Sequence, residues 1–316
     1  MGEYADAGEG RAGQRAVKFA ARRSEANIAR EMDQLREEEV MRKRVLAAIL
    51  VVGAVCSLAF ARSERATQQN TIDPGANLRD FQVYEFRRYT IKPGERQHFA
   101  LDFDTFFPEA FEQQGAIVAG SFLERQKPNG FTWIRGFHTI DARAVLNAAF
   151  YYGPLWKEHR QAVNAFIDDS DNVMLMRPLT PEREIPILPA VDPVADTNGA
   201  QGVIVAQIFS VKPDSVEALA KAAEPTFAAY RAAGAREAGV LVTLDAKNNF
   251  PQLPVRTDGP FLVWLGVVKD NQMLETSFMP EEQRAVSTLV ATGLLRGEPE
   301  VDVMDPTPRS RLRWLQ

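Results

Sequence analysis

The chain has 316 residues, of which 45% are hydrophobic and 25% charged, a composition typical of globular proteins and a length sufficient for two domains. Its 37 Lys and Arg face 42 Asp and Glu, a formal net charge of −5 that excludes the basic surface needed to bind nucleic acid. The single cysteine excludes a disulfide framework.

The first 61 residues divide into a polar tail and an apolar run. Residues 1–40 are rich in Ala, Gly, Arg and Glu, which predicts a disordered or helical tail. Residues 41–61 place a basic cluster before the apolar run from Val45 to Ala61, which ends in an A-x-A pattern typical of an export signal. This run of 17 residues also reaches the lower limit for a membrane-spanning helix. A third interpretation is a buried core helix.

Export of the C-terminal body is the interpretation we favour. If residues 41–61 are cleaved, the body is periplasmic or secreted; if they are retained, residues 45–61 anchor it in the inner membrane with the body outside. A start at Met41 instead of Met1 would remove the tail. Cys56 lies inside the apolar run, and Val55 before it argues against lipidation. The exported body therefore has no cysteine for a thiol nucleophile or a metal site.

A polar linker at 62–79 leads to the first organised unit, residues 80–180. Residue alternation predicts strands, and apolar side chains at helical spacing predict helices, with an interruption at Pro108. The expected elements are a strand at 81–91, a helix from 95, strands at 116–123 and 131–139, a helix at 142–151 capped by Asp141, a second helical piece at 156–166 and a strand at 173–176. This βαββαβ order is ferredoxin-like.

The same order returns after a Pro-rich linker at 181–200. The expected elements of residues 201–316 are strands at 203–211, 238–244, 261–268 and 301–304 and helices at 215–233 and 280–295. Both units end the first strand with Lys-Pro and carry Phe-x4-Gly in the third, which favours a tandem duplication. We therefore expect an α+β fold in which two ferredoxin-like repeats pack sheet to sheet as an α/β-barrel-like body, preceded by one hydrophobic helix.

Five segments carry a family resemblance. Residues 84–94 (YEFRRYTIKPG) and 150–156 (FYYGPLW) are similar to NIPSNAP proteins, and residues 249–256 (NFPQLPVR), 262–264 (LVW) and 306–310 (PTPRS) are similar to duplicated bacterial members. The resemblance implies tandem dimeric α/β-barrel domains, and implies little chemistry, since the family is linked only in general terms to vesicle traffic and mitochondrial quality control. Asp214, where the first repeat has Gly94, departs from the pattern, and residues 1–61 are not explained by it.

No catalytic motif is recognisable, so we expect a binding or scaffold protein rather than an enzyme. The three histidines, His98, His138 and His159, lack metal-binding spacing, and the acidic stretch 168–172 is better explained as a solvated turn than as a calcium site. We therefore expect no metal site.

The candidate ligand-binding residues are Arg88, Trp133, Arg135 and His138. Trp133 and Arg135 alternate on one strand face that could line the barrel interior, and Arg88 could join Arg135 as an anion anchor; His138 lies on the opposite face. The competing interpretation places Trp133 in the core and the arginines on the surface.

Two functional classes follow. The first is a small-ligand-binding or scaffold protein without a cofactor. The second is a dimeric α/β-barrel oxidoreductase, either cofactor-independent or dependent on haem, with His138 or His98 as the axial ligand. The expected partners are a small molecule or a protein, the membrane through residues 45–61 if these are uncleaved, and further copies of the chain in an oligomer; nucleic acid is not among them.

Overall fold

The computed structural model describes residues 80–315. The expected tail at 1–40, the signal or anchor at 41–61 and the linker at 62–79 lie outside the described residues, so these expectations stay predictions. Within the described range, no helix combines the length and apolar character needed to cross a bilayer.

The first half of the described chain follows the expected element order. Its elements are β1 (Val83–Ile91), α2 (Arg96–Phe106), α3 (Pro108–Gln113), β2 (Ile117–Glu124), β3 (Gly130–Phe137), α4 (Ile140–Tyr151), α5 (Pro154–Phe166) and β4 (Ile167–Pro178). Pro108 starts α3, where its missing N–H costs nothing. The expected cap of α4 was Asp141. The structure instead has Thr139 there, whose hydroxyl accepts from the Ala142 N–H at 3.0 Å.

The second half repeats this order after a short turn, η3 (Pro181–Arg183). Its elements are β5 (Val203–Ser210), α6 (Val216–Ala232), β6 (Arg236–Thr243), β7 (Phe261–Val268), α7 (Asn271–Met273), η4 (Leu274–Phe278), α8 (Met279–Val290) and β8 (Glu300–Pro306). Asp214 has φ of 58° and Gly94 has φ of 85°, so both take the left-handed conformation after their Lys-Pro pair. Aspartate tolerates this conformation, which explains the departure noted in the sequence.

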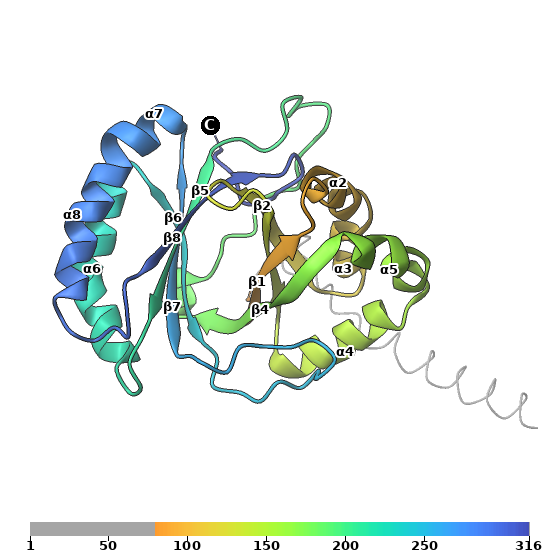
Figure 1. The fold of residues 1–316 in the computed structure, drawn as a ribbon, viewed down its shortest axis with the longest axis horizontal. Helices are drawn as coiled ribbons and strands as arrows, with labels where there is room; N and C mark the ends of the chain where they lie inside the picture. The colour runs from red at the N-terminus through yellow and green to blue at the C-terminus, as the bar shows by residue number, and fades with distance from the viewer. Residues whose placement is uncertain (1–79, 316) are drawn as a thin grey trace, which may run out of the picture. The chain divides into compact units, whose positions relative to one another are not determined.

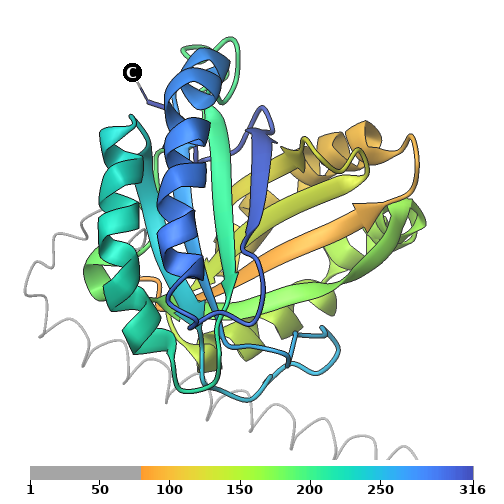
Figure 2. The ribbon, with the colours of Figure 1, turned by 60° about the vertical axis from the view of Figure 1, so that its left-hand side comes forward.

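All eight strands form one closed barrel in the order β1-β3-β2-β8-β5-β7-β6-β4. Each half supplies four adjacent strands, and antiparallel pairing of β2 with β8 and of β4 with β6 joins the halves. The sequence predicted only that the bare faces of the two sheets pack on each other. The structure adds backbone hydrogen bonds between the sheets at both edges. Helices α2–α5 cover one side of the barrel, and α6 and α8 cover the opposite side (Figures 1 and 2).

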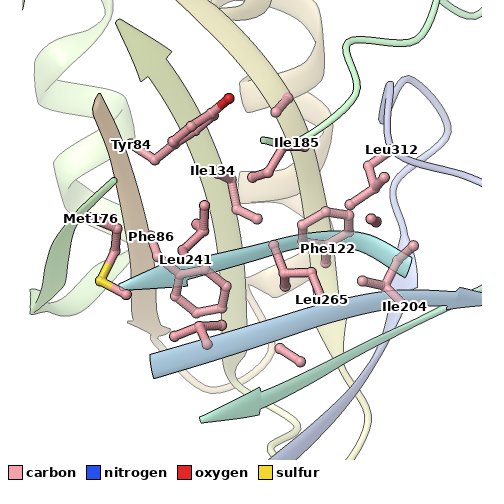
Figure 3. Packing of buried hydrophobic residues seen from close by; sticks show 14 of the residues in the cluster. Tyr84, Phe86, Phe122, Ile134, Met176, Ile185, Ile204, Leu241, Leu265 and Leu312 are labelled. Atoms are coloured by element: carbon pink, nitrogen blue, oxygen red, sulfur yellow. The ribbon is translucent and has the colours of Figure 1, made fainter. Parts of the chain in front are cut away.

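The barrel interior is a packed apolar core. Side chains from both halves converge there, among them Phe86, Phe122, Ile134, Ile204 and Leu265 (Figure 3). All five of these side chains are fully buried. The interior is therefore occupied by core side chains and is not the ligand space expected from the sequence.

Strand pairing shows that the two Phe-x4-Gly patterns matched in the sequence are out of register by one residue. Trp133 pairs with Arg87 and Trp264 pairs with Gln207, so Trp133 corresponds to Trp264, and Phe131 corresponds to Leu262 rather than to Phe261. A shift of one residue moves a side chain to the other face of a strand. Phe131 accordingly packs under the helices, whereas Phe261, the phenylalanine of the same Phe-x4-Gly pattern in the second half, packs inside the barrel.

The barrel predicts that neither half folds alone. A fragment of residues 78–180 would expose its share of the barrel core and leave the outer edges of β2 and β4 unpaired. We expect no folded monomer of this fragment by size-exclusion chromatography and circular dichroism. A monomer that unfolds cooperatively would contradict the dependence of the first half on the second.

Candidate functional site

A cavity of about 240 Å³ lies between the outer face of the first half's sheet and the helices that cover it. Residues 87 and 89 of β1 and residue 133 of β3 reach this layer because alternate strand residues point away from the barrel. Nine aromatic side chains line the cavity: Tyr89, Phe99, Phe103, Phe107, Phe111, Trp133, Phe150, Tyr151 and Trp156. This composition suits a flat apolar ligand.

A loop from the second half closes one side of the cavity. Gln252, Leu253 and Pro254, in the connection between β6 and β7, belong to its lining. The loop reaches α4 (Figure 1), where the Asn249 side-chain amide donates to the Ile140 carbonyl at 2.5 Å. Asn164, Ser170 and Asp171 line a more exposed side. The cavity is thus built by both halves.

Three of the five segments that carry the family resemblance meet at this cavity. Residues 84–94 supply Arg87 and Tyr89, residues 150–156 supply three aromatic rings, and residues 249–256 supply the closing loop. The other two segments lie elsewhere: residues 262–264 belong to β7, and in residues 306–310 Thr307 donates to the buried Asp104 carboxylate at 2.9 Å. Segments distant in sequence therefore converge on one place.

Beside the cavity, one buried carboxylate accepts hydrogen bonds from three arginines. Glu85 Oε2 accepts from Arg87 Nη1 at 2.8 Å and from Arg135 Nε at 2.6 Å. Glu85 Oε1 accepts from Arg143 Nε at 2.6 Å. Each of these four side chains is at most 1% exposed. We call this group the Glu85 cluster.

The Glu85 cluster has an excess of positive charge. Burial by itself would raise the pKa of Glu85, but the guanidinium groups of Arg135, Arg87 and Arg143 outweigh it and hold that pKa well below its ordinary value. Burial lowers the pKa of Arg143, and the two neighbouring arginines add to this effect against the attraction of Glu85. Arginine keeps its proton in proteins, so three positive charges face one negative charge.

Several polar atoms of this region have no hydrogen-bond partner among the described residues. They include Nη1 of Arg135, Nη2 of Arg143 and Nε1 of Trp133, the last on the cavity wall. The Arg135 guanidinium carbon lies 5.0 Å from the Phe111 ring centroid and 5.1 Å from that of Trp133. These cation–π contacts offset part of the charge.

The corresponding layer of the second half has neither the arginines nor their charge. Gln207 occupies the position of Arg87; its amide donates to Glu282 Oε1 at 2.6 Å and accepts from the Tyr230 hydroxyl at 2.5 Å. The Trp264 ring packs with Tyr230 at 4.9 Å and with Phe278 at 5.9 Å. Rings and a satisfied amide fill this layer.

Comparison with known proteins adds a remote likeness of fold. No family model matches the chain, and no curated protein matches it. A proposed monooxygenase from Lactobacillus acidophilus is 11% identical, with 73% of this chain and 97% of that chain covered and a TM-score of 0.46. An anthrone oxidase-like protein is 14% identical, covering 75% of this chain and 98% of that one, with a TM-score of 0.46.

A NIPSNAP family protein of unknown function from Agrobacterium tumefaciens is 22% identical, with a TM-score of 0.29. The match covers 31% of this chain and 89% of that chain. At these identities and scores, the likenesses concern the α/β-barrel fold and carry no argument about function.

The structure separates the four residues singled out from the sequence. Trp133 and Arg135 share a face as expected, but that face turns toward the helices and not into the barrel. Arg88 points to the opposite side, where its Nη1 donates to Glu300 Oε2 at 2.9 Å and its Nη2 lies 2.7 Å from Asp302 Oδ2. Arg88 and Arg135 therefore do not form a shared anion anchor. His138 follows β3 and stacks on Phe81 at 4.4 Å, outside the cavity lining.

Sequence reasoning missed Glu85, Arg87 and Arg143. One signal was present for two of them, because Glu85 and Arg87 are two residues apart in a strand and so share a face. Two charges on one face of an otherwise apolar strand indicate a buried pair. Arg143 lies on a helix and carries no such signal.

The histidines do not fit a haem in this cavity. None of them belongs to its lining. His98 is exposed on α2 and lies 2.9 Å from Glu95, and His159 stacks on Phe106 at 4.0 Å. Residues 168–172, expected as a solvated turn, belong to the irregular first part of β4, and within residues 80–315 no group of three His, Cys, Asp or Glu side chains could hold a metal ion.

Proposed function

We propose that the first half binds a small organic molecule with a flat apolar body in the cavity between its sheet and helices α2–α5. The observation that carries this proposal is the cavity itself, lined by nine aromatic side chains and by a buried guanidinium. Its volume of about 240 Å³ is below the roughly 300–1,000 Å³ of pockets for drug-sized molecules, so a ligand of one or two rings suits it.

The difference between the two halves supports the same cavity as the binding site. Both halves have a tryptophan at the same strand position, Trp133 and Trp264. Around Trp264 the layer is filled by aromatic side chains and the hydrogen-bonded Gln207, whereas around Trp133 it keeps a cavity. A structural role alone would require no cavity in either half.

The chain is proposed to be a NIPSNAP-like protein built from two ferredoxin-like repeats. Three segments of the resemblance meet at the cavity, which supports a shared binding role for them. The oxidoreductase alternative rests on fold likeness, and no arrangement of the described residues favours it over ligand binding. The proposed role is therefore binding, outside the cytoplasm if the expected export signal is used.

Blocking the cavity tests the proposal. Ser170 is half-buried and lines the cavity, so Ser170→Phe places a ring in the ligand space, whereas Ser277→Phe adds the same ring to an exposed position of the second half. We expect naphthalene-2-carboxamide to bind the wild-type protein and Ser277→Phe alike in isothermal titration calorimetry. Binding to Ser170→Phe should be at least about tenfold weaker, the equivalent of about 1.4 kcal/mol.

Equal affinity of the wild-type protein, Ser170→Phe and Ser277→Phe for the amide would show that the cavity is not the binding site. If a wider set of one-ring and two-ring aromatic compounds also fails to bind the wild-type protein, the proposed function is wrong.

A further inference from the structure

We infer that the ligand of this cavity carries a carboxylate, which binds against Arg87 and the buried donors beside it. This inference rests on the proposed function and names the chemical class of the molecule. It follows from the charge of the Glu85 cluster, from the donors that face the cavity and from the contrast with the second half.

The charge excess points to an anion. Arg87, Arg135 and Arg143 surround a single carboxylate, and all four side chains are at most 1% exposed. A buried charge without a counterion is costly, and a guanidinium does not escape that cost by losing its proton. The acidic residue that lines the cavity, Asp171, is exposed and forms no ion pair with Arg87. A ligand carboxylate would reduce the excess from two charges to one.

Arg87 is the member of the cluster that reaches the cavity. Its Nη1 is committed to Glu85, and its Nε donates to the Tyr89 hydroxyl oxygen at 2.9 Å. Its remaining nitrogen, Nη2, donates to no described residue. The guanidinium is thus fixed in place by two hydrogen bonds, and both N–H groups of Nη2 remain for a ligand.

Two further donors lie on the same wall. Trp133 is 2% exposed, its Nε1 has no hydrogen-bond partner among the described residues, and its ring centroid is 5.4 Å from the Arg87 guanidinium carbon. Burial raises the pKa of Tyr89, so its hydroxyl keeps the proton that it can donate. A carboxylate accepts several hydrogen bonds at once, and such charge-assisted bonds are stronger than neutral ones.

The second half lacks both the charge excess and the open donors. Gln207 replaces Arg87, Val205 stands at the position of Glu85, and Gly266 stands at that of Arg135. Both amide atoms of Gln207 are used, by Glu282 and by Tyr230. The excess of positive charge and the aromatic cavity therefore occur together, as expected for a ligand with an apolar body and an anionic group.

The experiment compares naphthalene-2-carboxylate with its neutral amide, naphthalene-2-carboxamide, by calorimetry on the full-length protein. The variant Arg87→Gln introduces the residue that the second half has at this position. Arg125→Gln is the matched control, because Arg125 pairs with Asp305 in an exposed place far from the cavity lining. Sodium phosphate, added in a third arm, tests whether an inorganic anion occupies the site instead.

We expect wild-type protein and Arg125→Gln to bind the carboxylate about tenfold to hundredfold more tightly than the amide. Arg87→Gln should lose this preference, so that its affinities for the carboxylate and for the amide lie within about twofold of each other. Since the wild-type comparison needs no variant, it decides the inference even if Arg87→Gln does not fold.

Equal binding of carboxylate and amide to the wild-type protein would overturn the inference and leave the proposed function standing. Binding of neither compound would overturn the inference, and the wider set of aromatic compounds then decides the proposed function. Phosphate that displaces the carboxylate but not the amide, at equal concentrations, would assign the charge excess to an inorganic anion and would also overturn the inference.

Discussion

Glu85→Gln is expected to lower the free energy of unfolding by about 3–5 kcal/mol, because it removes the single negative charge that three buried arginines share. Glutamine keeps the shape and one acceptor oxygen, so the loss reports charge and not a cavity. Urea unfolding followed by circular dichroism measures the change. A loss of this size is a large part of the stability of an ordinary domain.

The matched control is Asp305→Asn, which makes the same chemical change in an exposed ion pair. Asp305 is 50% exposed and pairs with Arg125 at 2.6 Å. Such pairs contribute at most about 1 kcal/mol. If Glu85→Gln costs no more than Asp305→Asn, Glu85 does not hold the arginines together and the charge excess has another source of compensation.

The effect of Glu85→Gln should depend on pH in one direction. The pKa of Glu85 is held below its ordinary value of 4.5, so the carboxylate stabilises the folded state above that value. Its contribution is lost as the pH falls further toward the lowered pKa of the folded state. The difference between wild-type protein and variant should be constant above about pH 5 and should shrink in more acidic solution.

Arg88→Met is expected to destabilise the protein by about 3–5 kcal/mol without changing ligand affinity. Arg88 is 5% exposed and joins β1 to β8 through Glu300 and Asp302, with Glu124 at 3.9 Å. Its removal leaves Glu124 and Asp302 buried, with Lys127 as their remaining ion-pair partner among residues 80–315. Thermal and urea unfolding measure the loss.

Arg125→Met is the control for this change, because Arg125, directly after β2, also pairs with an acidic residue of β8 but is 28% exposed. We expect it to cost less than about 1 kcal/mol. Burial already raises the pKa of Asp302, with help from Glu124, and the loss of Arg88 would raise it further. The loss of stability in Arg88→Met should therefore shrink as the pH falls from neutral, because protonation of Asp302 relieves the repulsion.

Ligand affinity should depend on Arg87 and not on its neighbour Arg88. Since Arg88 and Arg87 point to opposite faces of β1, Arg88→Met should leave carboxylate binding within about twofold of wild type. A large loss of binding in a folded Arg88→Met protein would mean that the barrel end and the cavity are coupled, and would contradict their separation.

The order of helices and strands was predictable because each element carries its own local pattern. Phenylalanines at helical spacing predicted α2, and the break at Pro108 was confirmed. The shared face of Trp133 and Arg135 was also predictable, since side chains alternate along a strand. These features depend only on neighbours in sequence.

Which face lies inside the barrel was not predictable. Residues of β1 are buried on both faces, by the barrel core on one and by helices on the other. Alternation between apolar and polar residues marks a strand only when one face meets water. The expected position of Arg135 inside the barrel was wrong for this reason. The spacing of Glu85 and Arg87 placed them on one face of β1, but it did not show whether that face meets the barrel core or the helices.

The βαββαβ order of both halves can be predicted from local patterns, because strand alternation, helical spacing and breakers act over a few residues. The pairing of β2 with β8 and of β4 with β6 emerges only when the chain is folded, and so does the meeting of residues 84–94, 150–156 and 249–256 around one cavity. These contacts join residues far apart in the chain. They form when the barrel closes, and closure depends on the burial of both sheets at once.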